Sequence, residues 1–235
     1  MQRPFYPEGE VCHLYLVHPP GGIVSGDQVT LELRAQAGAH AVLTTPAATK
    51  FYRARNEAPA RLVQNLSVRD AALEWLPQET LVFDGAQARA STRVDLASGA
   101  RFIGWEVLCL GRPASNEPFL RGRIHQDFEL RRDGVPLLLD RLRVTPGTAQ
   151  TAAWGLSGHE ALGTLMATPA TRDDADAVLA LDDAAVSCTL VDGVLLVRTL
   201  AAQGELVRRR LQRVWQVLRP RLLGRPALSP RIWST

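Results

Sequence analysis

Residues 101–110 read RFIGWEVLCL, and this stretch decides the fold class. It has no helical period, and it carries one acid, Glu106, among apolar side chains. Similar apolar runs lie at 73–76, 80–83 and 135–144. Short runs of this kind, separated by turn residues such as Asp133-Gly134, are typical of strands that are buried on both faces.

A strict alternation of apolar and polar residues indicates a second kind of strand. Residues 29–34 read VTLELR, and 91–96 and 127–130 repeat the pattern. Such strands bury one face and expose the other to water. Because strands recur at short intervals with no helical period between them, we predict a mainly β body over residues 1–155.

Residues 156–235 follow a different pattern. Apolar runs at 163–166, 186–190 and 194–200 predict three strands, and Asp192-Gly193 is a strong hairpin signal between the last two. Thr171, followed by acids, predicts the start of a helix after the first strand. A final helix, expected to end at Pro220, has one apolar face formed by Leu206, Val207, Leu211, Val214, Trp215 and Leu218. The order is β-α-β-β-α, and we expect this α+β portion, with its two helices, to pack on the β body as one compact unit.

Composition limits the class of protein. Of 235 residues, 46% are hydrophobic and 22% are charged, which is typical of a soluble chain of one or two domains. No apolar run approaches the roughly 20 residues that cross a bilayer, and the first residues lack a secretory signal. The three cysteines, Cys12, Cys109 and Cys188, do not suit a disulfide framework. We therefore predict a cytoplasmic protein with no membrane partner.

Arginine supplies almost all of the positive charge. Lys50 is the only lysine among 27 basic residues, and the net charge is +3. Apart from the cluster at 208–210, the arginines are interspersed with acids, whereas phosphate neutralisation needs clustered basic residues. A GC-rich coding bias explains the arginine excess at least as well, and we predict no nucleic-acid partner.

Two catalytic patterns are incomplete. Gly21 and Gly26 have the spacing of a phosphate loop, but Asp27-Gln28 stands where lysine and a hydroxyl residue are required, so we predict no nucleotide hydrolysis. Residues 155–159 read GLSGH, and the last glycine of a nucleophile elbow is replaced by histidine. A serine hydrolase that uses Ser157 and His159 is the alternative function, and the simpler interpretation is that Ser157 caps a turn with Glu160 three residues later.

Cys12 and His13 suggest a metal site at first sight. If 11–17 is a strand, however, adjacent side chains point to opposite faces and cannot share an ion without a bulge. We interpret Cys12 as a small core residue.

Two carboxylates inside apolar runs are more informative. Glu106 lies within 101–110, and Asp140 follows three leucines in 135–144. An acid buried on such a strand costs several kcal/mol unless it is paired, hydrated or bound to a cation. Asp140 has candidate partners in Arg141 and Arg143, whereas Glu106 has none nearby in sequence. A hydrated internal cavity or a cation path is therefore open for Glu106, because carboxylates bind divalent ions weakly and exchangeably.

Two sequence blocks are distinctive enough to indicate a family. The first, from residue 2 to residue 27, contains His18, Pro19, Pro20, Gly21, Gly22 and Gly26. The second, at 43–53, contains Lys50, Phe51, Tyr52 and Arg53. Further blocks at 73–79, 105–113 and 215–233 keep the same order, and together they span nearly the whole chain. The sequence resembles the UreD family of urease accessory proteins, also called UreH.

This resemblance implies both a fold and a function. The fold would be a mainly β, helicoidal stack of sheets with two helices. The protein would be a non-catalytic metallochaperone and scaffold, joining UreF and the GTPase UreG on apo-urease to promote nickel insertion. Nickel would pass through in transit, with no tightly bound cofactor. By motif position, the acids along the nickel path would be Glu10, Asp27, Glu106 and Asp140.

The sequence departs from the resemblance at one point. Members of the family usually carry a few dozen residues, including strands, before the block that here begins at Gln2. We therefore expect this version to lack the first strands of the family and to leave a sheet edge open.

Overall fold

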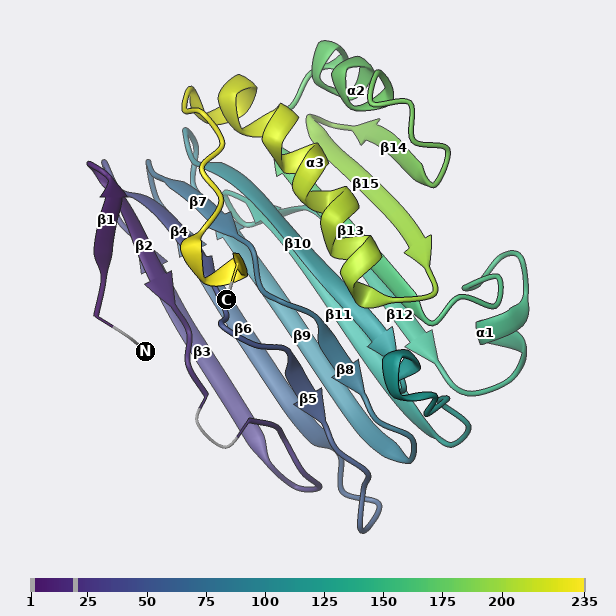
Figure 1. Ribbon diagram of the computed structural model, residues 1–235. Coiled ribbons are helices and arrows are strands. Elements are labelled where there is room, and N and C mark those ends of the chain that lie inside the picture. Colours follow the sequence, from purple (N-terminus) through teal and green to yellow (C-terminus); the bar gives the residue numbers. More distant parts are fainter. Residues whose placement is uncertain (1–2, 19–20, 235) are drawn as a thin grey trace.

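The computed structural model describes residues 3–18 and 21–234, and it is built of two stacked sheets with helices on one side (Figure 1). The ten-stranded sheet has the order β1-β2-β4-β7-β10-β13-β15-β14; β8 also pairs with β10, and β5 pairs with β8. Its strands are β1 (Phe5–Glu8), β2 (Val11–Tyr15), β4 (His40–Thr44), β5 (Thr49–Phe51), β7 (Ala72–Trp75), β8 (Thr80–Val82), β10 (Arg101–Leu110), β13 (Ala161–Thr168), β14 (Val186–Val191) and β15 (Val194–Ala201).

A smaller, five-stranded sheet forms the opposite layer, in the order β12-β11-β9-β6-β3. Its strands are β3 (Gln28–Ala35), β6 (Ala60–Val68), β9 (Ala86–Leu96), β11 (Gly122–Arg132) and β12 (Val135–Val144). The helices are α1 (Thr148–Thr151), α2 (Arg172–Leu179) and α3 (Gly204–Leu223), with short 3-10 turns at Pro113–Ser115 and Arg231–Ser234. The one-turn helix α1 was not predicted.

The chain winds between the two sheets. It passes from β3 to β4, returns to β6, continues to β7, and repeats the passage through β9 and β10. Each strand pairs in parallel with its equivalent in the next turn, as β3 does with β6 and β6 with β9. The mainly β, stacked arrangement is therefore confirmed.

Strand β10 shows how the alternation of side chains builds two cores. Phe102 and Leu108 point toward the five-stranded sheet, where Phe102 lies 6.4 Å from Phe128 between ring centres. Ile103 and Trp105 point the other way, into the core beneath α3. Since both faces of β10 are covered, the continuous apolar run 101–110 is a strand buried on both sides, as predicted.

The run 135–144 was wrongly predicted to be buried on both faces. It forms β12, the last strand of the five-stranded sheet, which pairs only with β11. Val135 and Leu139 are 62% and 52% exposed. An edge strand of an outer sheet has only one covered face, so outward side chains such as Leu139 lie in solvent.

The C-terminal portion confirms the predicted β-α-β-β-α order. β13 extends the large sheet by pairing antiparallel with β10, from Phe102 with Thr168 to Cys109 with Ala161. The β14–β15 hairpin turns at Asp192 and Gly193, both with positive φ, as a type I′ turn requires. Helix α2 begins at Thr171, whose backbone N–H donates to Asp174 at 2.8 Å in a capping box.

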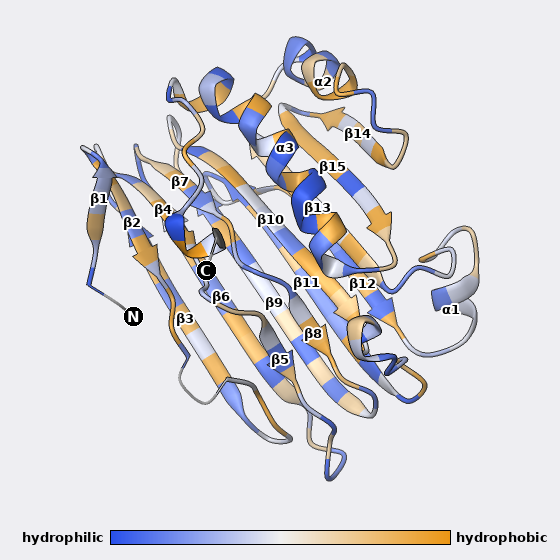
Figure 2. Ribbon diagram, in the orientation of Figure 1, coloured by the Kyte–Doolittle hydropathy of each residue, from blue (hydrophilic) through white to orange (hydrophobic). Residues whose placement is uncertain are grey.

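Helix α3 lies across the large sheet with its apolar face inward, as the two colours along it show (Figure 2). Its predicted end at Pro220 is wrong, because the helix continues to Leu223 and ends where Gly224 adopts a left-handed conformation. Leu222 and Leu223 are buried, and this burial offsets the backbone hydrogen bond that a proline removes. Leu206, placed on the apolar face by the sequence, is 44% exposed.

We predict that Gly163→Ala destabilises the junction between α3 and the sheet. A Cβ atom at Gly163 on β13 would lie 2.3 Å from Val207 Cγ1 and 2.9 Å from Leu211 Cδ1 of the helix. Because the helix must move to admit it, the free energy of unfolding should fall by about 1–3 kcal/mol. Urea denaturation followed by tryptophan fluorescence measures the loss, and an unchanged midpoint would contradict this account of the packing.

Candidate functional site

Glu106 is a buried acid in the layer between the two sheets. It alternates with Trp105 along β10 and points away from the helices, toward β9 and β11. Its two carboxyl oxygens contact the Thr92 hydroxyl on β9 and the Gln126 amide on β11. Burial, with a smaller contribution from the charge of Asp140, raises the pKa of Glu106 to about 7, although the hydrogen bonds from Thr92 and Gln126 act to lower it. The acid is therefore poised to gain or lose a proton near neutral pH.

Glu106 and Asp140 line the same small cavity. It holds about 20 Å³, close to the room that one water molecule needs. The remaining walls come from both sheets: Leu108, Gln126, Phe128, Leu142, Leu162, Thr164 and Met166. The Oε1 atom of Gln126 is buried there and accepts no hydrogen bond from the described residues. An acceptor left in this way fits a water molecule or a cation in the cavity.

The ion pair expected for Asp140 has a different partner. Arg198 of β15 donates to Asp140 at 2.7 Å, while Arg143 pairs with Asp127 at 2.6 Å. Side chains of neighbouring strand residues point to opposite faces, so Arg141 and Arg143 lie on the outer face of β12 and Asp140 on the inner one. Asp140 thus stands where the two sheets meet, with its side chain 25% exposed.

A larger cavity of about 470 Å³ lies further along the same layer. Its walls include the inner side chains of β3 and β6 and the loops that follow β2 and β4. Gln64 on this wall accepts a hydrogen bond from Thr92 at 2.8 Å, and Thr92 in turn contacts Glu106. A hydroxyl has only one hydrogen, so Thr92 donates it either to Gln64 or to Glu106 at any one time. Polar side chains therefore link the two cavities through an otherwise apolar core.

The other two predicted acids lie outside these cavities. Glu10 is in the turn between β1 and β2, where it is 89% exposed and pairs with Arg225 at 3.1 Å. Asp27 precedes β3 and accepts a hydrogen bond from the backbone N–H of Val24 at 3.2 Å. The structure thus brings together two of the four predicted carboxylates, Glu106 and Asp140.

The distinctive sequence blocks shape the larger cavity. His18, Gly21, Gly22 and Lys50 are among its lining residues, and Pro19 and Pro20 lie outside the described residues. Gly22 must be glycine, because a Cβ atom there would lie 2.2 Å from the Tyr52 ring.

Other residues of these two sequence blocks stabilise the loops that form this wall of the larger cavity. Phe51 is fully buried, Gly26 has a φ of 82° that favours glycine, and Arg53 reaches Asp84 at 3.4 Å.

The alternative sites find no support among the described residues. Ser157 donates to the carbonyl of Ala153 at 3.4 Å from a left-handed turn, and the His159 ring lies 3.1 Å from the carbonyl of Leu156. Neither the capping pair of Ser157 with Glu160 nor a contact between Ser157 and His159 is present there. His13 binds Glu8 at 2.7 Å, on the face of β2 opposite to Cys12. No group of three histidine, cysteine or acidic side chains in residues 3–18 and 21–234 could hold a metal ion.

Sequence reasoning missed a second buried set of charges, on the other face of the large sheet. Glu74 of β7 and Arg219 of α3 are both fully buried, and Arg219 Nε lies 3.0 Å from Glu74 Oε1. Arg219 also pairs with Glu8 of β1 at 2.7 Å. His40 and Trp215 hydrogen-bond to Glu74 at 2.8 and 2.6 Å. The sequence did contain a signal for this set, because Glu74 is an acid within the apolar run 73–76, just as Glu106 is within 101–110.

Fold and interior together define a class of protein: a stacked β structure whose inter-sheet layer carries carboxylates and a polar connection. Comparison with known proteins gives a family. The family model described as UreD urease accessory protein matches residues 1–234. A protein of Citrobacter koseri named urease accessory protein UreD is 44% identical over all of this chain and 82% of its own length. Proteins of the same name from Alcanivorax borkumensis and Pseudomonas putida W619 are 41% and 42% identical, over all of this chain and 82% and 84% of theirs.

The chain belongs to the UreD family of urease accessory proteins. This membership supports a role in the maturation of urease. No helix among the described residues is both long enough and apolar enough to cross a membrane.

Proposed function

We propose that this chain passes nickel toward apo-urease through the layer between its two sheets. The observation that carries the proposal is the cavity shared by Glu106 and Asp140, which a polar connection joins to the larger cavity near His18 and Lys50. Nothing in the packing of an inter-sheet core requires two acids and an unpartnered amide oxygen. A cation in passage would use all three.

The chemistry of these groups suits transfer better than storage. Carboxylate and amide oxygens bind a transition-metal ion more weakly than imidazole or thiolate ligands do. Binding of an ion displaces the proton of Glu106, and a pKa of about 7 allows the free acid to release that proton near neutral pH. An ion at Glu106 would therefore exchange part of its hydration shell for protein ligands that can later release the ion.

The proposed setting is the cytoplasm, in a complex with UreF and the GTPase UreG on apo-urease. The chain itself would act without catalysis, as a metallochaperone and scaffold, with no tightly bound cofactor. No nucleic acid and no membrane would take part. The incomplete phosphate loop at Gly21 and Gly26 agrees with a separate protein supplying GTP hydrolysis.

Complementation of cells that lack this protein tests the proposal. Removing a passage ligand by Glu106→Gln or Asp140→Asn should lower the nickel content and activity of urease about tenfold or more, the range seen when a metal environment is altered. Equal amounts of soluble variant protein must be shown by immunoblot.

The matched control is Glu129→Gln. Glu129 lies on the outer face of β11, paired with Arg131 at 2.7 Å, so its loss should leave activation unchanged. Parallel Glu10→Gln and Asp27→Asn variants test whether these exposed acids belong to the path. Wild-type urease activity in cells with Glu106→Gln, or no rescue by soluble wild-type protein, would contradict the proposal.

A further inference from the structure

The outer face of the five-stranded sheet carries a row of basic residues across four of its five strands, β6, β9, β11 and β12. In register, Gln28 of β3 stands beside Arg61 of β6, then Arg89 of β9, His125 of β11 and Arg143 of β12. Arg123 lies on the same face of β11, two residues before His125. The row contains no acid.

The charges in this row are largely uncompensated. Among the described residues, no acid forms an ion pair with Arg61, Arg89 or Arg123, and the latter two are exposed. Burial, with the charges of Arg143, Arg89 and Arg123, lowers the pKa of His125. Like charges on neighbouring strands repel each other, so the row disfavours the isolated sheet and is relieved by an anionic partner.

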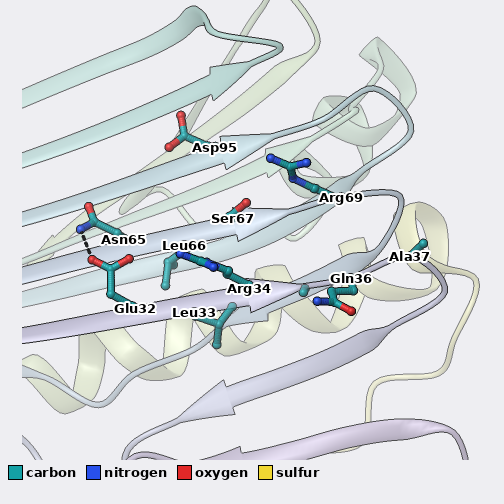
Figure 3. Close-up of a pocket in the computed structure, with 11 residues that line it drawn as sticks. Glu32, Leu33, Arg34, Gln36, Ala37, Asn65, Leu66, Ser67, Arg69 and Asp95 are labelled. Atoms are coloured by element: carbon teal, nitrogen blue, oxygen red, sulfur yellow. Dashed lines mark hydrogen bonds between the residues drawn. The ribbon is translucent and has the colours of Figure 1, made fainter.

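The other half of the same face has a different charge pattern. There the strands carry Glu32, Asp95 and Glu129 among the arginines, and Arg93 pairs with Asp95 at 2.8 Å. A shallow hollow of about 750 Å³ in this half has both signs of charge on its walls (Figure 3). The excess of positive charge is thus confined to the end where β6, β9 and β11 begin.

Two large apolar side chains are exposed at the same end. Leu120, just before the start of β11, is 67% exposed. Trp154, in the turn after α1, is 76% exposed. That turn is fixed to the end of β12, because Leu156 is buried in one core cluster with Ile124 and Val144. Exposed tryptophan and leucine at the same end of a sheet as unpaired arginines fit the composition of protein interfaces, in which tryptophan and arginine are enriched.

We propose that the basic row, together with Trp154 and Leu120, is the surface that docks an acidic protein partner, with urease apoprotein as that partner. This inference rests on the proposed role in urease maturation. The apolar side chains favour a protein over a polyphosphate chain, which would leave them without a partner.

Binding of the full chain to purified, nickel-free urease apoprotein, measured by biolayer interferometry over a range of NaCl concentrations, tests this surface. The variant R89E/R123E should bind about tenfold more weakly or worse, because reversed charges repel an acidic partner. Wild-type affinity should fall as salt rises. Trp154→Ala should weaken binding without changing its dependence on salt.

The matched control is R34E/R69E, with the same change of charge in the other half of the face. Arg34 and Arg69 are both exposed and line the hollow with acids, so this variant should bind within about threefold of wild type. Equal weakening by the two double variants, or no weakening by R89E/R123E, would overturn the inference. So would absence of binding by the wild-type chain.

Two further measurements separate docking at this row from nucleic-acid binding and from the nickel passage. Tight binding of a labelled DNA duplex that R89E/R123E abolishes, with urease binding intact, would make the row a nucleic-acid site and overturn the inference.

Glu106→Gln should bind urease apoprotein like wild type, since Glu106 is internal. If Glu106→Gln blocks activation while R89E/R123E binds normally, docking at this row is wrong and the nickel passage stands. If Glu106→Gln activates urease normally while R89E/R123E fails to bind, the passage is wrong and the docking surface stands.

Discussion

Replacing Arg219 by methionine should lower the free energy of unfolding by about 3–5 kcal/mol, the range for removing one partner of a buried ion pair. The guanidinium is fully buried and reaches both Glu74 and Glu8, whose side chains are 0% and 8% exposed. It also donates to the carbonyl of Pro226 beyond α3. Methionine fills a similar volume but leaves two carboxylates without their cation.

The state of Glu8 shows what the arginine contributes. Burial works to raise the pKa of Glu8, but hydrogen bonds from Arg219 and His13 outweigh it and hold that pKa below its ordinary value. Without Arg219, Glu8 must take up a proton or remain charged in an apolar layer. The loss of stability should therefore be largest at neutral and alkaline pH, where a carboxylate gives up its proton.

Urea denaturation at neutral pH measures this effect, with Arg225→Met as control. Arg225 is a partly exposed residue just past the end of α3, and its partner Glu10 is 89% exposed. Such a pair contributes at most about 1 kcal/mol. If Arg219→Met cost no more than Arg225→Met, the buried charges would have no structural role.

Glu106→Gln should stabilise the chain, and only above the pH at which the unfolded acid ionises. Below pH 4.5, the ordinary pKa, Glu106 is protonated in the folded and the unfolded chain alike. Between pH 4.5 and about 7 the unfolded chain loses this proton while the folded chain keeps it, so stability falls as the pH rises. Above about 7 the loss is complete and amounts to roughly 3 kcal/mol, since one pKa unit is about 1.4 kcal/mol.

Glutamine escapes this loss, because it never ionises and can still hydrogen-bond to Thr92 and Gln126. The difference in unfolding free energy between Glu106→Gln and wild type should be small at about pH 5 and approach roughly 3 kcal/mol at about pH 8. Glu129→Gln serves as control, because Glu129 lies on the outer face. A difference that does not change with pH would show that Glu106 is not a buried acid of raised pKa. A more stable variant that fails to activate urease would show that the acid is kept for function.

The sequence was enough for most of the fold. Apolar runs such as 101–110 and alternating runs such as 29–34 identified the two kinds of strand, because side-chain period and burial are local properties. The prediction failed where burial depends on a neighbour far away in the chain. Residues 135–144 are as apolar as a core strand but lie at an edge, and Pro220 is tolerated because Leu222 and Leu223 find a core beyond it.

For the interior site, the sequence was sufficient to predict the buried acid but not the residues around it. An acid in a doubly buried strand is visible from its neighbours, and this identified Glu106. Its surroundings could not be predicted, because Thr92, Gln126 and Asp140 come from three other strands. Glu74 carried the same local signal, but Arg219 and Trp215, which bind it from α3, are more than a hundred residues away.

The contact between Glu8 and Arg219 joins residues 211 positions apart and sets an order of events during synthesis. Each turn of the winding can pair with the turn before it as soon as it leaves the ribosome. Within the β1–β2 hairpin Glu8 has only His13 as a partner, and Arg219 reaches it once α3, near the end of the chain, has been made. A nascent chain that stops short of α3 therefore has paired sheets, an uncovered face and a Glu74 without Arg219, the condition in which a chaperone or a protease would act on it.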